Sequence, residues 1–527
     1  MNKNRLIDNR IFMPALLIII AICIPLALYE EKSLNALNAV FTYIVEVFSW
    51  GYLWYGVLLV AAALYFSFSR YGNIVLGDPK EKPQFTLFEY ASILIAMGIG
   101  STIMRTGMLQ WTSVANNPPA GVEAGSAEAI LMGNSYSMFL WGFQVFAIFV
   151  MIAPAMAYVL HVKKRPLMRI SEAARVILGD KLTDGWAGRI LDILFLLSIL
   201  TGAAVTLGLG APIVTYNLSK LLNIEVTFGL TIIVTIVWVV LFSISAYLGV
   251  DKGIKRLSTF NIYLAGAFAL FILLFGPGVF ILNYFTDSIS YLAANYLSFS
   301  LNTDAVYMGE ASHIQSNTVF WFAYSATWAM LHSVFAARIS KGRTVREMIL
   351  TYLLAPTLLS WIATGILGGL GVHRYLTGQL PILDMVKGDE RMAVIPEILS
   401  TLPLGGLAIV VFIIVALVFL TTTLDSTTYT VAAYTSTKDM SKHEPPKSLR
   451  IVVAGVITAI ALVLMRIGGL APLEVISGLM GLPIIFITFL MLYAAKKMMD
   501  NDKAWLTNVR EKKDSIKREP KDVSSNS

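Results

Sequence analysis

The chain has 527 residues, of which 57% are hydrophobic and only 14% are charged. Soluble proteins carry roughly 25% charged residues, so this composition excludes an ordinary soluble enzyme or binding domain. The formal net charge of +7 does not indicate a nucleic-acid partner, because the basic residues follow membrane topology.

The hydrophobic residues gather in twelve stretches of about twenty residues, the length that a helix needs to cross about 30 Å of hydrocarbon. They predict spans at 11–29, 48–69, 88–110, 138–160, 190–217, 227–248, 258–283, 317–336, 348–370, 404–434, 450–466 and 471–495. We therefore predict an all-α integral membrane protein with a short N-terminus (1–10), one membrane domain (11–496) and a basic tail (497–527).

Cytoplasmic loops of membrane proteins are rich in Lys and Arg. With the N-terminus inside, most of the 40 Lys and Arg residues fall in cytoplasmic segments. The exceptions lie in outer loops or at spans: Lys32, Lys220, Arg374, Lys387, Arg391, Arg105 and Arg466. We expect both termini in the cytoplasm and the protein in the cell membrane. The single cysteine, Cys23, excludes a disulfide framework or a cysteine metal site within one chain.

Polar residues interrupt two of the spans. The first interruption is Met97-Gly98-Ile99-Gly100-Ser101-Thr102, and the second is Phe419-Leu420-Thr421-Thr422-Thr423-Leu424-Asp425-Ser426. Lipid cannot hydrogen-bond a broken backbone, so a break persists only where protein or water satisfies it. Because secondary transporters bind substrates and ions at such interrupted helices, both segments indicate a transporter.

Two longer connections are expected on the outer side. The first covers residues 112–137, and the second, 284–316, alternates aromatic and polar residues, which predicts an amphipathic helix on the surface. A shorter interfacial helix is expected at 166–178. If the broken third span and the eighth span are equivalent, the spans form a 2+5+5 arrangement with inverted repeats.

Three motifs resemble the betaine/carnitine/choline transporter family. Ala337-Arg338-Ile339-Ser340-Lys341-Gly342-Arg343-Thr344-Val345-Arg346-Glu347 resembles its cytoplasmic loop after span eight, and Gly249-Val250-Asp251-Lys252-Gly253-Ile254-Lys255-Arg256-Leu257-Ser258 resembles its loop between spans six and seven. Met97-Gly98-Ile99-Gly100 resembles its glycine-rich break. The resemblance implies a LeuT-like 5+5 inverted repeat (about 88–283 and 317–495) after two extra helices, often assembled as a homotrimer.

The resemblance also implies transport of a zwitterionic or quaternary-ammonium solute, driven by sodium or by exchange. In this family an aromatic box on spans four and eight holds the cationic head by cation–π attraction. On span four, Trp141 matches, while Phe146 and Phe149 stand where Trp and Tyr are usual. Span eight carries Tyr324, Ser325 and Trp328, so the implied box is thinner and more polar. Ordinary core packing of these aromatic residues is the alternative.

Arg105 and Met108 depart from the family pattern, which usually has a glycine and a glutamate there. A base in place of an acid disfavours choline and favours a carboxylate, which Arg binds bidentately. Snorkelling to the interface is the alternative role for Arg105. With Gly98 and Gly100 of the break, these residues complete the predicted substrate site: Trp141, Phe146, Phe149, Tyr324, Ser325, Trp328, Arg105, Gly98 and Gly100.

The resemblance implies a sodium site with Thr422 and Thr423 hydroxyls, Leu94 and Met97 carbonyls opposite, and Phe419. Hard oxygen ligands suit sodium, and hydroxyl packing between membrane helices is the alternative. His332, one turn beyond Trp328, is expected to be a packed core histidine.

No catalytic constellation or phosphate-binding loop is visible, so neither an enzyme nor an ATP-driven pump is expected. The predicted function is a sodium-coupled secondary transporter of betaine, carnitine or an amino-acid-like solute. The partners are the solute and lipid, without nucleic acid or any cofactor other than the coupling ion. A sodium-independent exchanger and a membrane osmosensor are the alternatives.

Overall fold

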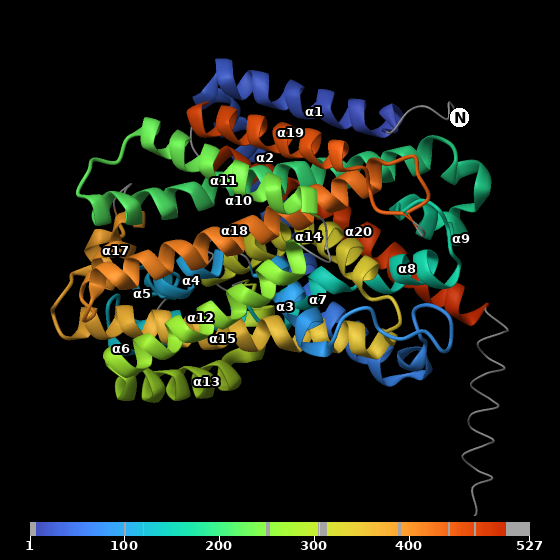
Figure 1. The fold of residues 1–527 in the computed structure, drawn as a ribbon. Coiled ribbons are helices and arrows are strands. Elements are labelled where there is room, and N and C mark those ends of the chain that lie inside the picture. The colour runs from blue at the N-terminus through green and yellow to red at the C-terminus, as the bar shows by residue number, and fades with distance from the viewer. Residues whose placement is uncertain are drawn as a thin grey trace, which may run out of the picture.

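The computed structural model describes residues 7–99, 102–119, 121–248, 253–303, 305, 313–387, 391–440, 443–467 and 471–501, which are mainly α-helical (Figure 1). The helices are α1 (Asn9–Leu28), α2 (Glu30–Phe68), α3 (Leu87–Gly98), α4 (Thr102–Leu109), α5 (Trp111–Asn116), α6 (Ala127–Leu140), α7 (Phe143–Val150), α8 (Ala153–Ala157), α9 (Ile170–Thr183), α10 (Trp186–Leu222), α11 (Phe228–Leu248), α12 (Lys255–Phe275), α13 (Gly278–Leu301), α14 (His313–Ile339), α15 (Val345–Leu376), α16 (Ile382–Met385), α17 (Val394–Ser400), α18 (Gly405–Thr435), α19 (Lys447–Ile467) and α20 (Ala471–Asp500). Short turns of other helix types lie at Arg70–Asn73, Tyr158–Val162 and Arg391–Ala393.

Each predicted span overlaps one or more helices in its described part. Among the described residues, eight helices are long and apolar enough to cross a membrane, and a ninth span is added if the bent pair Leu87–Gly98 and Thr102–Asn116 is counted. The described structure thus confirms an all-helical membrane protein and leaves the count of twelve as a prediction. The polar centre of α14 explains why this buried helix is not among the eight.

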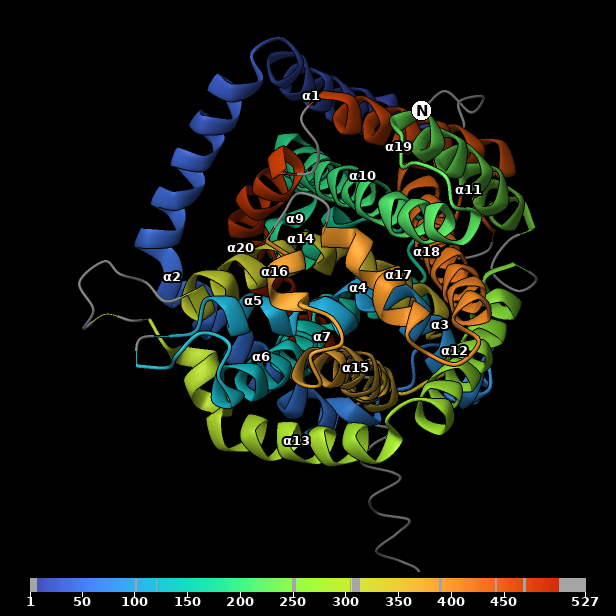
Figure 2. The ribbon, with the colours of Figure 1, turned by 90° about the vertical axis from the view of Figure 1, so that its left-hand side faces the viewer.

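The two N-terminal helices lie at the edge of the bundle. Figure 2 shows α1 beside α19, while α2 descends along the outside before it joins the bundle. α1 packs on α10, and α2 packs on α7, α14 and α20. The described part of α2 before Phe48 is largely exposed. The part of α2 after Phe48 is therefore the part that packs against the central bundle.

The predicted break in the third span is present. α3 ends at Gly98, and the axis of the following segment is bent by 70° from that of α3. The start of α3 is fixed by a reciprocal cap, in which the Thr86 hydroxyl accepts from the Glu89 N–H and the Glu89 carboxylate accepts from the Thr86 N–H. Gly100 lies outside the described residues.

The predicted break in the tenth span is wrong, because α18 is one continuous helix through Phe419–Ser426. Its hydroxyl groups bond to carbonyls of the preceding turn, for example Ser426 to the Thr422 carbonyl at 2.8 Å and Thr427 to the Thr423 carbonyl at 2.7 Å. Hydroxyl side chains that bond back in this way satisfy themselves and leave the helix intact.

The fourth span is broken instead, which the sequence analysis did not predict. α6 ends at Leu140 and α7 begins at Phe143, and a Cβ on Gly142 would lie 2.9 Å from the Phe139 carbonyl oxygen. Only glycine fits this close approach. The span also begins earlier than expected, since α6 starts at Ala127. The predicted connection 112–137 is therefore mostly helix, with loop only between α5 and α6.

The predicted surface helix is α13, which starts at Gly278 rather than 284 and ends at Leu301. Gly276 and Pro277 end the preceding helix, so the predicted span 258–283 is too long at its C-terminal end. α13 packs on α6 and α15 at the rim of the bundle (Figure 2). The predicted helix at 166–178 is α9, shifted to Ile170–Thr183. The tail beyond 501 lies outside the described residues.

The loop between α14 and α15, which carries the motif after span eight, packs against the start of α3. Gly342 has a φ of +80°, and a Cβ there would lie 2.4 Å from the Lys82 carbonyl oxygen. Next to it, the buried Arg343 donates to the Phe85 carbonyl at 2.7 Å and covers the Tyr90 ring at 4.2 Å. The loop between α14 and α15 therefore anchors the start of α3, the helix that breaks at Gly98.

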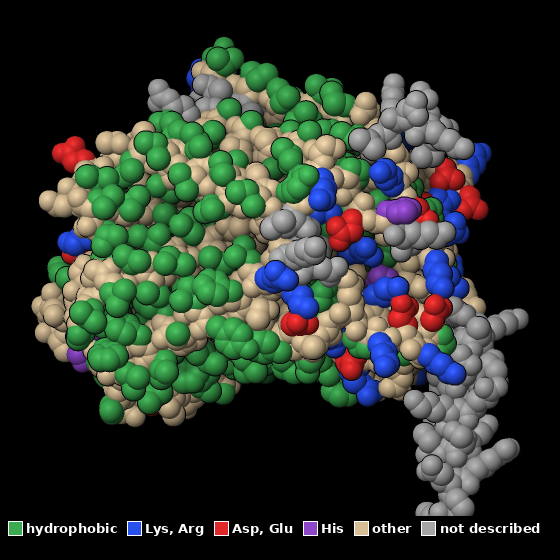
Figure 3. Space-filling model, viewed as in Figure 1, with side chains coloured by type: hydrophobic (Ala, Val, Ile, Leu, Met, Phe, Trp, Pro, Cys, Tyr) green, Lys and Arg blue, Asp and Glu red, His purple; other side chains and the backbone are tan. Residues whose placement is uncertain are grey.

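Figure 3 shows hydrophobic side chains over the middle of one face, as expected of a lipid-facing surface. Lys, Arg, Asp and Glu gather toward the end of the bundle where α1 begins and α20 ends. Both ends of the described chain thus lie at the same, charged end of the molecule.

Candidate functional site

A small cavity of about 30 Å³ lies in the middle of the bundle at the break after α3. Space of this size holds on the order of two water molecules, so a larger solute can bind here only after the walls move apart. The walls come from both broken spans and from three continuous helices, α10, α14 and α18. The residues that line the cavity are Met97, Gly98, Ile99, Thr102, Trp141, Phe149, Thr206, Tyr324, Trp328, His332 and Thr423.

Aromatic rings on α14 follow one another along one side of the cavity. Tyr324 and Trp328, four residues apart on one helix face, have ring centroids 6.4 Å apart, and Trp328 and His332 are 5.9 Å apart. Trp321 fixes the register of α14, because its indole donates to the Leu140 carbonyl at the end of α6 at 2.7 Å.

Trp141 occupies the break of the fourth span, next to Gly142. It packs edge-on against Trp321 with centroids 5.3 Å apart. The indole nitrogens of Trp141 and Trp328 are buried and have no hydrogen-bond partner within the described residues. A buried donor without a partner costs about 1–3 kcal/mol. A ligand with an acceptor that bonds to either indole N–H would therefore bind more tightly.

The structure brings five of the predicted substrate-site residues together around the cavity: Gly98, Trp141, Phe149, Tyr324 and Trp328. Phe146 lies behind the wall, where its ring is 3.5 Å from a Cβ built on Gly98 and 5.9 Å from the Phe149 ring. Ser325 is buried outside the cavity wall. Arg105 lies on α4, half-buried and away from the cavity lining.

Three of the five predicted sodium residues, Phe419, Thr422 and Thr423, have oxygen atoms clustered beside the cavity. The Thr423 hydroxyl donates to the Ala96 carbonyl of α3 at 3.2 Å and lies 3.0 Å from the Phe419 carbonyl. The Thr422 hydroxyl lies 2.9 Å from the same Phe419 carbonyl. The helix carbonyl that meets α18 is therefore that of Ala96, which lies between the predicted Leu94 and Met97.

The last carbonyls of a helix have no partner within that helix, which makes the end of α3 a source of oxygen ligands. Among the described residues, no group of three His, Cys, Asp or Glu side chains is placed to hold a metal ion. An ion at this point would be held by neutral hydroxyl and carbonyl oxygens.

The sequence analysis did not assign three of the wall residues to the site. His332 was expected to pack in the core, yet it lines the cavity together with Thr206, and Thr102 was considered only as part of the break. The spacing of Tyr324, Trp328 and His332, four residues each, was the available signal for His332. Thr206 had no such signal, because its contact depends on how α10 crosses α14.

None of the described residues that line the cavity carries an Asp, Glu, Lys or Arg side chain. A charge in such a buried apolar site is costly unless it is paired. The site is therefore suited to a ligand whose own charges sum to zero.

The chain is similar to solved structures and to a known protein family. One similar solved structure is a Na⁺-coupled sialic acid symporter in a substrate-bound outward-open state, with 14% identity, a TM-score of 0.43, and 84% of this chain and 86% of that chain covered. Another is a nucleobase-cation-symport-1 family transporter in a closed conformation with bromovinylhydantoin bound, with 15% identity, a TM-score of 0.30, and 80% of this chain and 78% of that chain covered. A model of the BCCT, betaine/carnitine/choline family transporter, matches residues 10–504, so the chain belongs to that family of secondary transporters.

Proposed function

We propose that this family member is a sodium-coupled secondary transporter of a small zwitterion, such as betaine, carnitine or an amino-acid-like solute. The observation that carries the proposal is the uncharged aromatic cavity at the break of α3. Trp141, Tyr324 and Trp328 offer ring faces to a cationic head, and each such contact contributes about 0.5–2 kcal/mol.

The same cavity supports a zwitterion rather than a simple cation. A quaternary ammonium without a counter-charge would enter a low-dielectric site with no acid on its described walls, whereas a zwitterion brings its own carboxylate. The unpartnered indole N–H groups of Trp141 and Trp328 add donors that suit a carboxylate. Arg105, outside the wall, is proposed to attract carboxylates as they approach.

Sodium coupling is supported by the oxygen cluster at α3 and α18. The Thr423 hydroxyl is within hydrogen-bond distance of the Ala96 and Phe419 carbonyls, and the Thr422 hydroxyl of the Phe419 carbonyl. Sodium prefers such hard oxygen ligands. Leu94 and Met97 remain proposed carbonyl ligands on the same turn. An ion here would join α18 to the broken end of α3 and so favour the bound state of the cavity.

We also propose the finer architecture implied by the family. It comprises twelve spans, two inverted repeats over about 88–283 and 317–495, a homotrimer, and both termini in the cytoplasm of the cell membrane. The collection of charged residues at the end where α1 begins and α20 ends supports this orientation (Figure 3).

The test is uptake of labelled solutes into proteoliposomes under an inward sodium gradient, a potassium gradient, or no gradient with unlabelled solute inside. The solutes are betaine, carnitine, choline, glycine and dimethylglycine. We expect accumulation of a zwitterion only with sodium. Uptake that requires internal solute but not sodium identifies an exchanger. Osmotic activation of an associated response without any solute flux would identify an osmosensor and contradict transport.

A further inference from the structure

His332 occupies a wall of the central cavity, although its sequence position was compatible with simple packing. The side chain is 2% exposed and lies on α14, one turn beyond Trp328. Its neutral imidazole has one nitrogen that donates a hydrogen bond and one that accepts.

The plane of the imidazole is fixed by its neighbours. It stacks on Phe149 with centroids 4.1 Å apart and planes at 19°, and it meets the Trp328 ring edge-on at 5.9 Å. The next residue, Ser333, ties the two helices together, because its hydroxyl donates to the Phe149 carbonyl at 2.7 Å and accepts from the Ile152 N–H at 3.2 Å. The stack therefore cannot slide without breaking these bonds.

The hydrogen bonds of the buried groups indicate which nitrogen of the His332 ring carries the proton. Nδ1 is bonded to the hydroxyl of Tyr352 on α15, which is fully buried. That contact is the one hydrogen bond that the described structure gives the Tyr352 hydroxyl, and a buried phenolic O–H needs an acceptor. Tyr352 therefore donates to Nδ1. The proton of the neutral imidazole is then on Nε2, which leaves an N–H donor for the cavity.

We propose that His332 is the selectivity residue for the carboxylate of the transported zwitterion, with its Nε2–H as donor and Tyr352 and Phe149 as positioning residues. The cationic head would lie against the aromatic rings of Tyr324 and Trp328, and the carboxylate would lie toward the next turn of α14, at His332. This inference rests on the proposed function and names the chemical class: a small ammonium carboxylate whose two charges are separated by about one helical turn or less.

The experiment measures binding of betaine and choline, which share the trimethylammonium head and differ in the carboxylate, to purified full-length protein by calorimetry. His332→Phe keeps the ring stack on Phe149 and removes both nitrogens. A hydrogen bond to a charged group contributes enough that we expect betaine affinity to fall by roughly 10- to 100-fold, with choline affinity unchanged within about threefold. His332→Gln, which retains an N–H donor, should recover part of the betaine affinity.

Two further variants separate selectivity from packing. Tyr352→Phe removes the bond that fixes the tautomer, so betaine affinity should fall by less than in His332→Phe, again without change for choline. The matched control is His161→Phe, another buried histidine, whose Nε2 lies 2.7 Å from the Ala337 carbonyl oxygen away from the cavity. That variant should bind both solutes as the wild type does.

The outcomes are distinguishable. If wild type binds betaine and His332→Phe binds it equally well, or loses betaine and choline by the same factor while still folded, His332 does not read the carboxylate. If His332→Phe weakens the binding of dimethylglycine, whose ammonium has an N–H, but not that of betaine, the imidazole of His332 accepts a hydrogen bond from the solute. The proposed role as a donor to the carboxylate is then wrong. If wild type binds no solute of the panel, the proposed function fails and this inference fails with it.

Discussion

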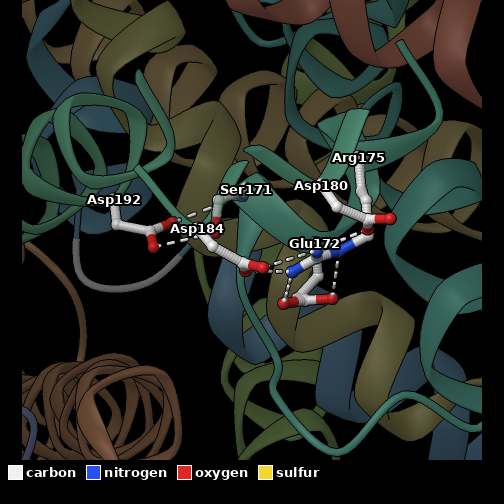
Figure 4. A network of polar contacts seen from close by, with 6 residues as sticks. All are labelled: Ser171, Glu172, Arg175, Asp180, Asp184 and Asp192. Carbon is white, nitrogen blue, oxygen red and sulfur yellow. Dashed lines mark hydrogen bonds and ion pairs between the residues drawn. The ribbon is translucent and has the colours of Figure 1, made fainter. Parts of the chain in front are cut away.

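The central cavity and the charged end of the molecule around α9 differ in how they accommodate polar groups. The described cavity walls hold no charged side chain. At α9, by contrast, Arg175 alone pairs with Glu172 at 2.8 Å, Asp180 at 2.8 Å and Asp184 at 2.6 Å (Figure 4). Water near this end screens charges that would be prohibitive in the middle of the bundle.

A second network beside that cluster binds α9 to its neighbours. The Ser171 hydroxyl donates to Asp192 at 2.8 Å (Figure 4), and the Tyr434 hydroxyl at the end of α18 donates to the same carboxylate at 2.5 Å. Arg169 pairs with Asp8 at 3.0 Å. Ion pairs and charged hydrogen bonds therefore hold helices together at one end of the molecule. The central site has no charged side chain on its described walls, so the charges there would be those of its ligand.

Among the rings proposed to hold the cationic head of the solute, Trp328 should contribute most to binding. Trp328→Ala should weaken zwitterion binding by about 1–2 kcal/mol through the loss of a desolvated cation–π contact. Trp50→Ala, which removes an indole that is 60% exposed on α2, is the control. Unchanged affinity in a folded Trp328→Ala protein would exclude this residue from the site.

The oxygen cluster should show the next largest effect. Replacing Thr422 and Thr423 together by Ala should raise the sodium concentration for half-maximal uptake several-fold and leave solute binding at saturating sodium largely intact. Each hydroxyl is one of a few oxygen ligands, so a partial loss is expected. Thr435→Ala, at the far end of the same helix, is the control. Indifference of wild-type uptake to replacing sodium by potassium would contradict sodium coupling.

Variants of Arg105 show whether a positive charge outside the neutral cavity wall increases the uptake of carboxylate-bearing solutes. Arg105→Gly should reduce uptake of carboxylate-bearing solutes by less than roughly tenfold, because the interaction acts at a distance through a partly hydrated medium. Arg105→Lys should restore part of it, since Lys keeps the charge but not the planar fork. Equal competition by choline and betaine in the wild type would show that Arg105 does not select by charge.

The sequence predicted the helical fold and the position of the α3 break because both depend on local properties, namely the length of apolar runs and the glycines around Met97. It predicted a break in α18 wrongly, because Thr and Ser residues satisfy their own hydroxyls along a continuous helix. It missed the break at Gly142, which a close approach to the Phe139 carbonyl imposes.

For the site, the aromatic residues of α14 were identifiable from their spacing of four residues and from the family resemblance. The places of Thr206 and Arg105 relative to the cavity, and the hydrogen-bond partner of His332, were not, because they depend on how the helices cross. In particular, the partner of His332 is Tyr352 on another helix, and no local pattern connects the two residues.

The smallest effect is expected at the charged end, from Arg175→Gln. Hydrogen bonding from Arg175 lowers the pKa of Asp184 below its ordinary value. A carboxylate with a lowered folded-state pKa stabilises the fold at pH values above its unfolded-state pKa, and this contribution is lost as the pH falls through the folded-state value.

Asp180 and Asp184 are largely exposed, and exposed pairs contribute about 0–1 kcal/mol each. Arg175→Gln should therefore lower the melting temperature at pH 7 by a few degrees at most, measured by differential scanning fluorimetry, and leave solute affinity unchanged. The difference from wild type should shrink only as the pH falls below the ordinary Asp pKa of 3.8, because Asp184 with its lowered pKa becomes protonated there. The control, Lys387→Gln, breaks a single exposed pair with Asp384 and should show almost no change. A loss of solute affinity in Arg175→Gln would contradict the separation of scaffold charges from the neutral site, because it would make the α9 cluster part of the binding energetics.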